Sequence, residues 1–210
     1  MRLVKNLCRI IVGIVFIYSG FVKGIDPLGS DYKFTDYFNA FGMGWMNATT
    51  LFFSFALSLA EFLIGIALLF NLWVSRMAWG SLLFMAFFTP LTLVLALTNP
   101  VSDCGCFGDA MILTNWQTFW KNIILLLLAI MIFVYRKEYK SSLPLMGQFS
   151  FLTLAGAGML CLSIYCYRHL PVLDFRPYAV GKNITESMRL PEGAQPPAVD
   201  GLRYSWVWQS

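Results

Sequence analysis

Charged side chains are scarce in this chain: Asp, Glu, Lys and Arg make up 12% of its 210 residues, whereas 58% are hydrophobic. A soluble domain of this length has too much surface to cover with so few polar side chains. The only histidine supplies at most one axial ligand to a haem, so haem binding explains little. The sequence has no basic stripe, because Lys and Arg stand at the ends of apolar runs, and no nucleic-acid partner is expected.

Long apolar runs replace the missing polar surface, and five of them approach the length of about 20 residues that crosses a bilayer. The predicted fold is all-α, a polytopic membrane helical bundle over residues 1–167, followed by a Pro-rich tail over residues 168–210. Thr114 and Gln117 have the spacing of a capping box, which predicts that the fourth span starts there. The expected spans are at about residues 4–24, 48–69, 77–97, 119–135 and 146–167.

Lysine and arginine predict the orientation of these spans. One side of the predicted bundle collects Arg2, Lys5, Arg9, Arg76, Arg136, Lys137 and Lys140. The connections on the opposite side carry only Lys23, Lys33 and Lys121. By the positive-inside rule, we expect the N-terminus in the cytoplasm and the C-terminal tail outside.

Two cysteines one residue apart stand in a polar loop between the third and fourth spans. Thiol–disulfide exchange needs one thiolate to attack and a second thiol nearby to resolve the mixed disulfide. Gly105, between Cys104 and Cys106, permits the backbone angles that so small a ring requires. The predicted orientation puts this loop in the oxidising compartment, where disulfide chemistry belongs. We therefore hypothesise a redox dithiol at the outer face of the bundle.

Other roles for the cysteines give weaker explanations. A structural disulfide between the paired cysteines would close too short a loop to stabilise the fold much, and their spacing is not that of a zinc motif. Small apolar packing suits Cys8 and Cys161 better. Cys166 is either a third redox thiol or a packing residue, and packing is favoured. Five cysteines, an odd number, cannot all pair within the chain.

Activation of the pair has to come from residues distant in sequence. Asp103 and Asp109 flank the cysteines, and negative charge raises the pKa of a nearby thiol. A positive neighbour lowers the pKa of a thiol. Lys23, Lys121, His169 or a helix N-terminus are the candidates for this role.

Three features of the neighbouring segments predict a slot beneath the loop. Glu61 lies mid-span, where a carboxyl group is costly unless paired or protonated, and we expect the protonated form. It serves either an interhelical hydrogen bond or proton handling. Pro90 predicts a kink in the third span. An amphipathic helix, either an aromatic belt or a lid over the dithiol, is predicted from helical spacing of Phe34, Tyr37, Phe38 and Phe41.

Three stretches resemble DoxX-like membrane proteins: residues 9–23, Glu61 followed by Gly65, and residues 103–108. The Cys-Gly-Cys-Phe-Gly loop is similar to that of the MauE branch, methylamine-utilisation membrane proteins linked to disulfide formation in a periplasmic partner. The resemblance covers about residues 7–135. It implies a four-helix core in a bacterial inner membrane, to which this chain adds a fifth span and the tail. It also implies thiol oxidation or a quinone-linked oxidoreductase complex.

Two functions follow from these features. In the first, the Cys104–Cys106 disulfide oxidises thiols of a separate periplasmic or membrane protein and is regenerated by quinone in the slot. Glu61 and Pro90 would shape that slot. In the second, the bundle is a non-catalytic anchor of a larger envelope complex, and its tail docks the partner.

Overall fold

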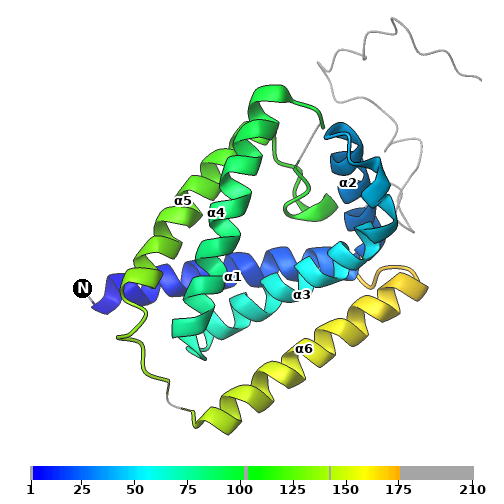
Figure 1. The fold of residues 1–210 in the computed structure, drawn as a ribbon. Helices are drawn as coiled ribbons and strands as arrows, with labels where there is room; N and C mark the ends of the chain where they lie inside the picture. The colour runs from blue at the N-terminus through cyan, green and yellow to red at the C-terminus, as the bar shows by residue number, and fades with distance from the viewer. Residues whose placement is uncertain (1, 102–103, 142, 176–210) are drawn as a thin grey trace, which may run out of the picture. The chain divides into compact units, whose positions relative to one another are not determined.

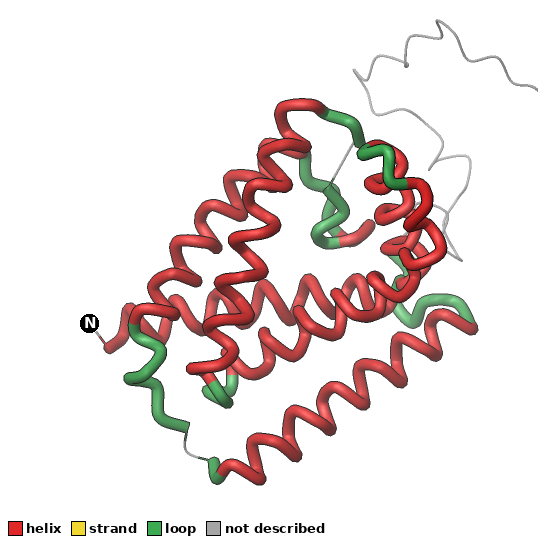
Figure 2. The backbone as a smooth tube through the Cα atoms, in the orientation of Figure 1, coloured by secondary structure: helices red, strands yellow, loops and turns green. Residues whose placement is uncertain are grey.

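The computed structural model describes residues 2–101, 104–141 and 143–175, and within these ranges it contains helices and no strand (Figures 1 and 2). The predicted all-α class is therefore confirmed. Residues 176–210, most of the predicted tail, lie outside the described residues, as does Asp103. The elements are α1 (Arg2–Ile25), α2 (Pro27–Ala40), η1 (Gly44–Thr49), α3 (Thr50–Leu69), α4 (Val74–Thr98), η2 (Gly108–Ala110), α5 (Asn115–Val134) and α6 (Leu145–Arg168).

Five helices are long and apolar enough to cross a membrane, and many of their large apolar side chains are exposed. Hydrocarbon around the protein makes such exposure favourable, and helices satisfy their own backbone hydrogen bonds there. The chain is a multi-pass membrane protein. The candidate spans are Leu3–Ile25, Gly44–Leu69, Val74–Thr98, Asn115–Val134 and Leu145–Arg168.

The start of α5 follows from its first residues. Thr114 Oγ1 accepts a hydrogen bond from Gln117 N at 3.3 Å, and Thr114 N donates to Gln117 Oε1 at 3.0 Å. Together they satisfy two backbone N–H groups that would otherwise lack partners at the helix start. The capping box predicted from the sequence is present, and the helix begins at Asn115 rather than at residue 119.

Helices α1 and α3 form the closest pair in the bundle and run side by side (Figure 1). Glycines make this approach possible. A Cβ atom built on Gly20 would lie 2.6 Å from Phe62 N, and one built on Gly65 would lie 2.5 Å from Ile17 N. Small residues of this kind let membrane helices pack backbone to backbone.

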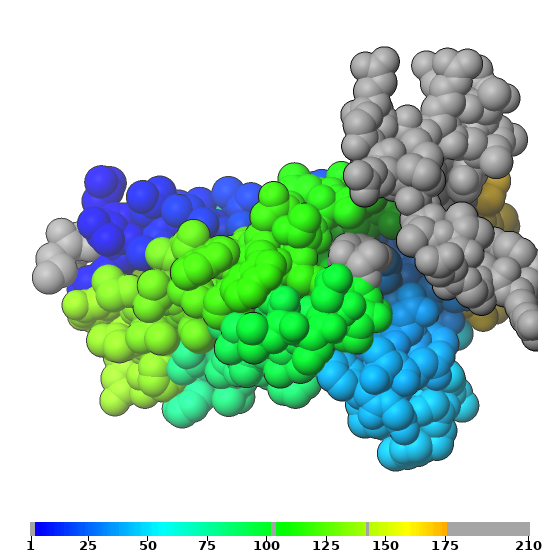
Figure 3. Space-filling view, turned by 90° about the horizontal axis from the view of Figure 1, so that it is seen from above, coloured from blue at the N-terminus to red at the C-terminus, as the bar shows by residue number. Residues whose placement is uncertain are grey.

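Helices α4 and α5 form a second pair, while α6 packs against α1, α2 and α3. The loop between α4 and α5 returns toward α1 and α2 (Figure 1). Its two cysteines line a cavity together with residues of α1 to α5. Figure 3 shows the surfaces of α4 and α5 in green beside the blue surface of α2 and η1. Pro90 lies inside α4, which runs without interruption from Val74 to Thr98.

Basic residues gather at the end of the bundle opposite the cysteine loop. Lys5 Nζ pairs with Glu138 Oε2 at 2.6 Å, and Tyr139 Oη donates to Lys5 O at 2.9 Å. Arg9 Nη1 donates to Leu68 O and, at 2.9 Å, to Leu69 O, the last carbonyl groups of α3. A cation stabilises these unpaired carbonyl groups at a helix C-terminus.

Candidate redox site

The cysteine loop is fixed to the bundle by hydrogen bonds to its backbone. Ser19 Oγ, on α1, donates to Cys106 O at 2.8 Å. Tyr37 Oη, on α2, donates to Cys104 O at 2.5 Å. Both of these anchors are backbone carbonyl groups, one on each cysteine.

Two glycines permit the turn that brings the sulfurs together. Gly105 has φ +62° and Gly108 has φ +51°, in the left-handed region that glycine enters at least cost. Gly108 N donates to Gly105 O at 3.0 Å and closes the turn. Phe107, between them, is buried and packs edge-on against the Tyr18 ring. The loop geometry thus depends on the spacing of glycines that the sequence shows.

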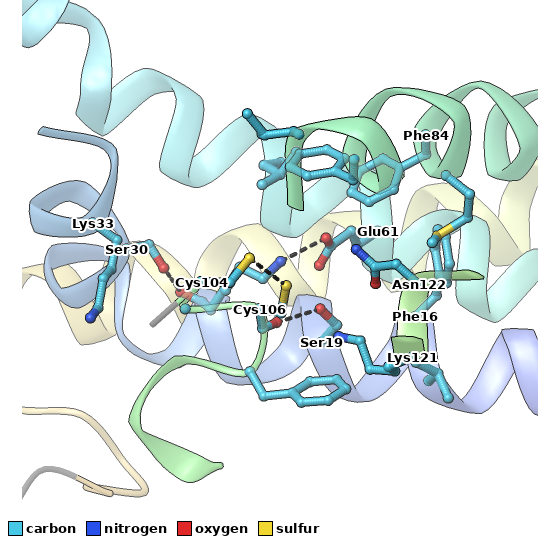
Figure 4. A pocket seen from close by; sticks show the side chains of 18 of the residues that line it. Phe16, Ser19, Ser30, Lys33, Glu61, Phe84, Cys104, Cys106, Lys121 and Asn122 are labelled. Carbon is cyan, nitrogen blue, oxygen red and sulfur yellow. Dashed lines mark hydrogen bonds and ion pairs between the residues drawn. The ribbon is translucent and has the colours of Figure 1, made fainter. Parts of the chain in front are cut away.

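The two thiols are in direct contact: Cys104 Sγ and Cys106 Sγ lie 3.0 Å apart (Figure 4). Both are free thiols in this structure. A disulfide bond has a sulfur–sulfur length of about 2.05 Å, so the bond can form after a movement of about 1 Å. The structure brings together the pair that the sequence singled out.

The pair is polarised, with one thiol far more acidic than the other. The pKa of Cys106 is lowered to about 6 by the hydrogen bond from Cys104, and further by the charges of Lys121 and Lys23, against the opposing effects of burial and Glu61. The pKa of Cys104 is raised, because its thiol donates that hydrogen bond and is itself buried. Of the two thiols, Cys106 is therefore the one that ionises more readily.

Of the three basic residues that the sequence analysis considered as activators of the pair, two line the cavity beside the sulfurs and one does not. Lys121 Nζ, near the start of α5, lies 4.2 Å from the centre of the Phe107 ring and lines the same cavity as the sulfurs. Lys23, on α1, also lines it. His169 is exposed at the end of α6, stacked on Tyr165. The activating charges therefore come from α1 and α5.

A cavity of about 740 Å³, counting its open mouth, lies beside the sulfurs (Figure 4). Helices α1 to α5 and the cysteine loop all contribute to its lining. Most of the wall is apolar, and the aromatic part consists of Phe16, Phe34, Tyr37, Phe84, Phe88 and Phe107. Polar groups interrupt it at Ser19, Lys23, Ser30, Lys33, Glu61, Lys121 and Asn122.

Part of this wall comes from α2, the amphipathic helix predicted from its aromatic spacing. Phe34 and Tyr37 line the cavity, whereas Phe38 packs edge-on against Phe53 of α3. Helix α2 ends at Ala40, with Phe41 as its C-cap. The helix therefore forms a wall of the cavity and an anchor for the loop, in addition to any contact with the membrane interface.

The buried carboxyl group of Glu61 has a partner that the sequence analysis did not identify. Lys23 Nζ lies 2.6 Å from Glu61 Oε1, and the residues are only 7% and 3% exposed. The sequence analysis named pairing and protonation as the two ways to bury this carboxyl group, and the structure provides a cation as its partner. The two residues are 38 positions apart, and only the close packing of α1 on α3 brings them together.

The remaining cysteines do not join the pair. Cys166 is buried on α6 but does not line the cavity, so the structure does not bring it to Cys104 and Cys106. Cys8 is buried in the main apolar core, and Cys161 is exposed on α6. Within the described ranges, no group of three His, Cys, Asp or Glu side chains is placed to hold a metal ion.

Comparison with known proteins gives one family match. The family model of the methylamine utilisation protein MauE matches residues 1–135, which include α1 to α5, the cysteine loop and the Lys23–Glu61 pair. Searches of curated proteins and of solved structures find no match. Because the family model covers well over half of the sequence, the chain belongs to the MauE family.

Proposed function

We propose that this protein is a thiol–disulfide oxidoreductase of the bacterial inner membrane that oxidises dithiols of a separate protein through Cys104 and Cys106. The observation that carries the proposal is the contact between the two sulfurs, 3.0 Å apart, with only one of them acidic. Such asymmetry is what exchange requires, because a thiolate of low pKa is the better leaving group. Membership of the MauE family supports a membrane protein. The support for the thiol–disulfide chemistry comes from the geometry of Cys104 and Cys106.

The acidities of the two cysteines set the direction of each step. A substrate thiolate attacks Cys104 Sγ of the Cys104–Cys106 disulfide, the sulfur–sulfur bond breaks, and Cys106 leaves as the thiolate. The second substrate thiolate then attacks the substrate sulfur of this mixed disulfide, and Cys104 leaves and takes up a proton. The substrate loses two electrons in forming its disulfide, and the Cys104–Cys106 pair gains them.

The lining of the cavity supports a quinone as the oxidant that would regenerate this disulfide. Aromatic side chains of the wall suit a flat apolar ring, and the buried side chains of Lys23 and Asn122 carry N–H groups that could donate to its oxygens. A bound quinone supplies an acceptor for two electrons and two protons. Phe84 and Phe88, stacked at 4.4 Å on α4, lie on the same wall and would hold the ring.

The charge distribution supports the orientation that this function needs. Lys5, Arg9 and their contacts lie at one end of the bundle, and the cysteine loop lies at the other. With the basic end in the cytoplasm, the sulfurs face the periplasm. A periplasmic or membrane protein with reduced cysteines would then be the electron donor.

Trapping of the mixed disulfide tests this assignment. The full chain in lipid nanodiscs would be oxidised and mixed with a reduced dithiol peptide, with a short-chain benzoquinone as acceptor. We expect peptide disulfide and quinol in equal amounts. With the oxidised wild-type protein and a peptide that carries a single thiol as probe, the adduct should form at Cys104, because Cys106 is the better leaving group. An adduct mainly at Cys106, equal adducts at both cysteines, or no oxidation of the dithiol peptide would contradict the proposal.

An accessory role is the second candidate, and the anchoring of the loop favours it. The hydrogen bonds from Ser19 and Tyr37 go to backbone carbonyls, so a loop without sulfurs can keep its shape. If the protein only anchors a complex, replacing both cysteines with serine should leave the complex and its activity intact. Loss of activity with an intact complex would instead favour the oxidoreductase.

A further inference from the structure

The buried Lys23–Glu61 pair leaves one oxygen without a partner. Glu61 Oε1 accepts from Lys23 Nζ at 2.6 Å, but no group among the described residues donates a hydrogen bond to Glu61 Oε2. Glu61 is 3% exposed, and the residue lines the cavity beside the cysteines (Figure 4). A buried carboxylate oxygen left without a donor costs more than a typical hydrogen bond contributes.

The surroundings of this oxygen limit what can donate to it. The cavity wall is mostly aromatic and aliphatic, and the ammonium group of Lys121 lies over the Phe107 ring. Asn122 Nδ2 donates to Thr92 Oγ1 at 3.2 Å. A bound molecule with a hydroxyl group on an apolar ring could donate a hydrogen bond to Glu61 Oε2 and pack its ring against the apolar wall.

We propose that Glu61 makes this cavity a site selective for the hydroxyl-bearing, reduced form of an aromatic ring, a hydroquinone, over the quinone. Glu61 Oε2 accepts from the ring hydroxyl, while Glu61 Oε1 accepts from Lys23 Nζ. A quinone has only carbonyl oxygens, which accept and cannot donate, so it leaves Oε2 without a partner. This inference rests on the proposed function, because it specifies which redox form of the electron acceptor the cavity would hold more tightly.

Selectivity for the reduced ring has a redox consequence. Tighter binding of the reduced form raises the midpoint potential of the bound couple, by about 30 mV for each tenfold preference in a two-electron reaction. The bound ring would therefore be a stronger oxidant than the same ring free in the membrane. That change favours electron flow from Cys104 and Cys106 toward the ring.

Binding measurements without turnover test the selectivity. The full chain carrying Cys104→Ser and Cys106→Ser would be titrated in nanodiscs with three ligands: a short-chain benzoquinone, its hydroquinone and the dimethyl ether of that hydroquinone. Because hydrogen bonds to charged groups are worth about 1.5–3 kcal/mol, we expect the hydroquinone to bind about tenfold to a hundredfold more tightly than its ether. If the hydroquinone binds no more tightly than the quinone and the ether, the inference is overturned, and Oε2 would be left to a bound water.

Two variants connect the selectivity to Glu61. Glu61→Gln should lose most of the preference for hydroquinone over ether, because the amide is neutral. Ser58→Ala is the matched control, since Ser58 is buried on the same helix, donates only to Phe55 O and does not line the cavity. An unchanged preference in Glu61→Gln would also overturn the inference. The comparison of ligands on the unmodified Glu61 stands even if that variant does not fold.

A separate measurement distinguishes this inference from the proposed function. Oxidation of a dithiol peptide by the pre-oxidised wild-type protein, in a single turnover without quinone, does not involve the ring. If the peptide is not oxidised, the proposed function fails. If the peptide is oxidised and the hydroquinone shows no preference over its ether, only the selectivity is refuted.

Discussion

Replacing Gly20 with alanine should separate α1 from α3 at the point where Lys23 meets Glu61. The new Cβ would lie 2.6 Å from Phe62 N and 2.6 Å from Ser58 O. Ordinary contact needs about 3.4 Å or more, and both neighbours are backbone atoms of α3, which cannot turn aside as a side chain can. The helices must therefore move apart by about 1 Å.

This displacement has a cost that can be estimated. Overfilling a well-packed interior destabilises a protein by about 1–3 kcal/mol. At about 2–4 °C for each kcal/mol in a chain of this size, the midpoint of thermal unfolding should fall by about 2–12 °C. The Lys23–Glu61 contact of 2.6 Å should lengthen as well, because Glu61 stands between the two contacted residues.

Thermal unfolding of the protein in one detergent, followed by circular dichroism, would measure the shift. Gly158→Ala is the matched control, because a Cβ at Gly158 on α6 meets no atom within 4 Å. Alanine favours a helix over glycine by about 1 kcal/mol, so this control should be neutral or slightly stabilised. A Gly20→Ala protein as stable as the control would refute the close packing of α1 on α3.

Three further predictions concern the loop and the start of α5. Iodoacetamide should alkylate Cys106 at a rate that rises around pH 6 and leave Cys104 largely unmodified at neutral pH, as peptide mass spectrometry would show; equal labelling would contradict the polarised pair. Lys121→Gln removes a charge that lowers the pKa of Cys106, so the midpoint of alkylation should move to higher pH; an unmoved midpoint would exclude Lys121 as an activator. Thr114→Val removes the hydrogen bond from Gln117 N and should lower the unfolding free energy by about 1 kcal/mol; denaturant titration would detect it, and unchanged stability would argue against the cap.

Local patterns predicted the elements of this fold well. Apolar length identified the spans, since a bilayer imposes its thickness on any helix that crosses it. Thr114 and Gln117 are three residues apart, so their reciprocal hydrogen bonds could be read from spacing alone. The aromatic period of residues 34–41 likewise indicated α2, because side chains three and four positions apart share a helix face.

The site depended on contacts that no local pattern contains. Lys23 and Glu61 are 38 residues apart, and Tyr37 is 67 residues from the carbonyl group it holds in Cys104. The sequence suggested both cysteines and a cationic activator, but not which thiol becomes the thiolate. That asymmetry arises from the direction of one hydrogen bond and the positions of two ammonium groups, which only the packing of α1, α5 and the loop determines.

Helix α6 stands apart from this chemistry in two respects. No residue of α6 lines the cavity, and the family match ends at residue 135, before α6 begins at Leu145. Changes on its outward side, such as at Leu154 with 76% exposure, can therefore accumulate without disturbing the sulfurs. A reporter group attached there would record neighbours in the bilayer and leave the reaction centre unaltered.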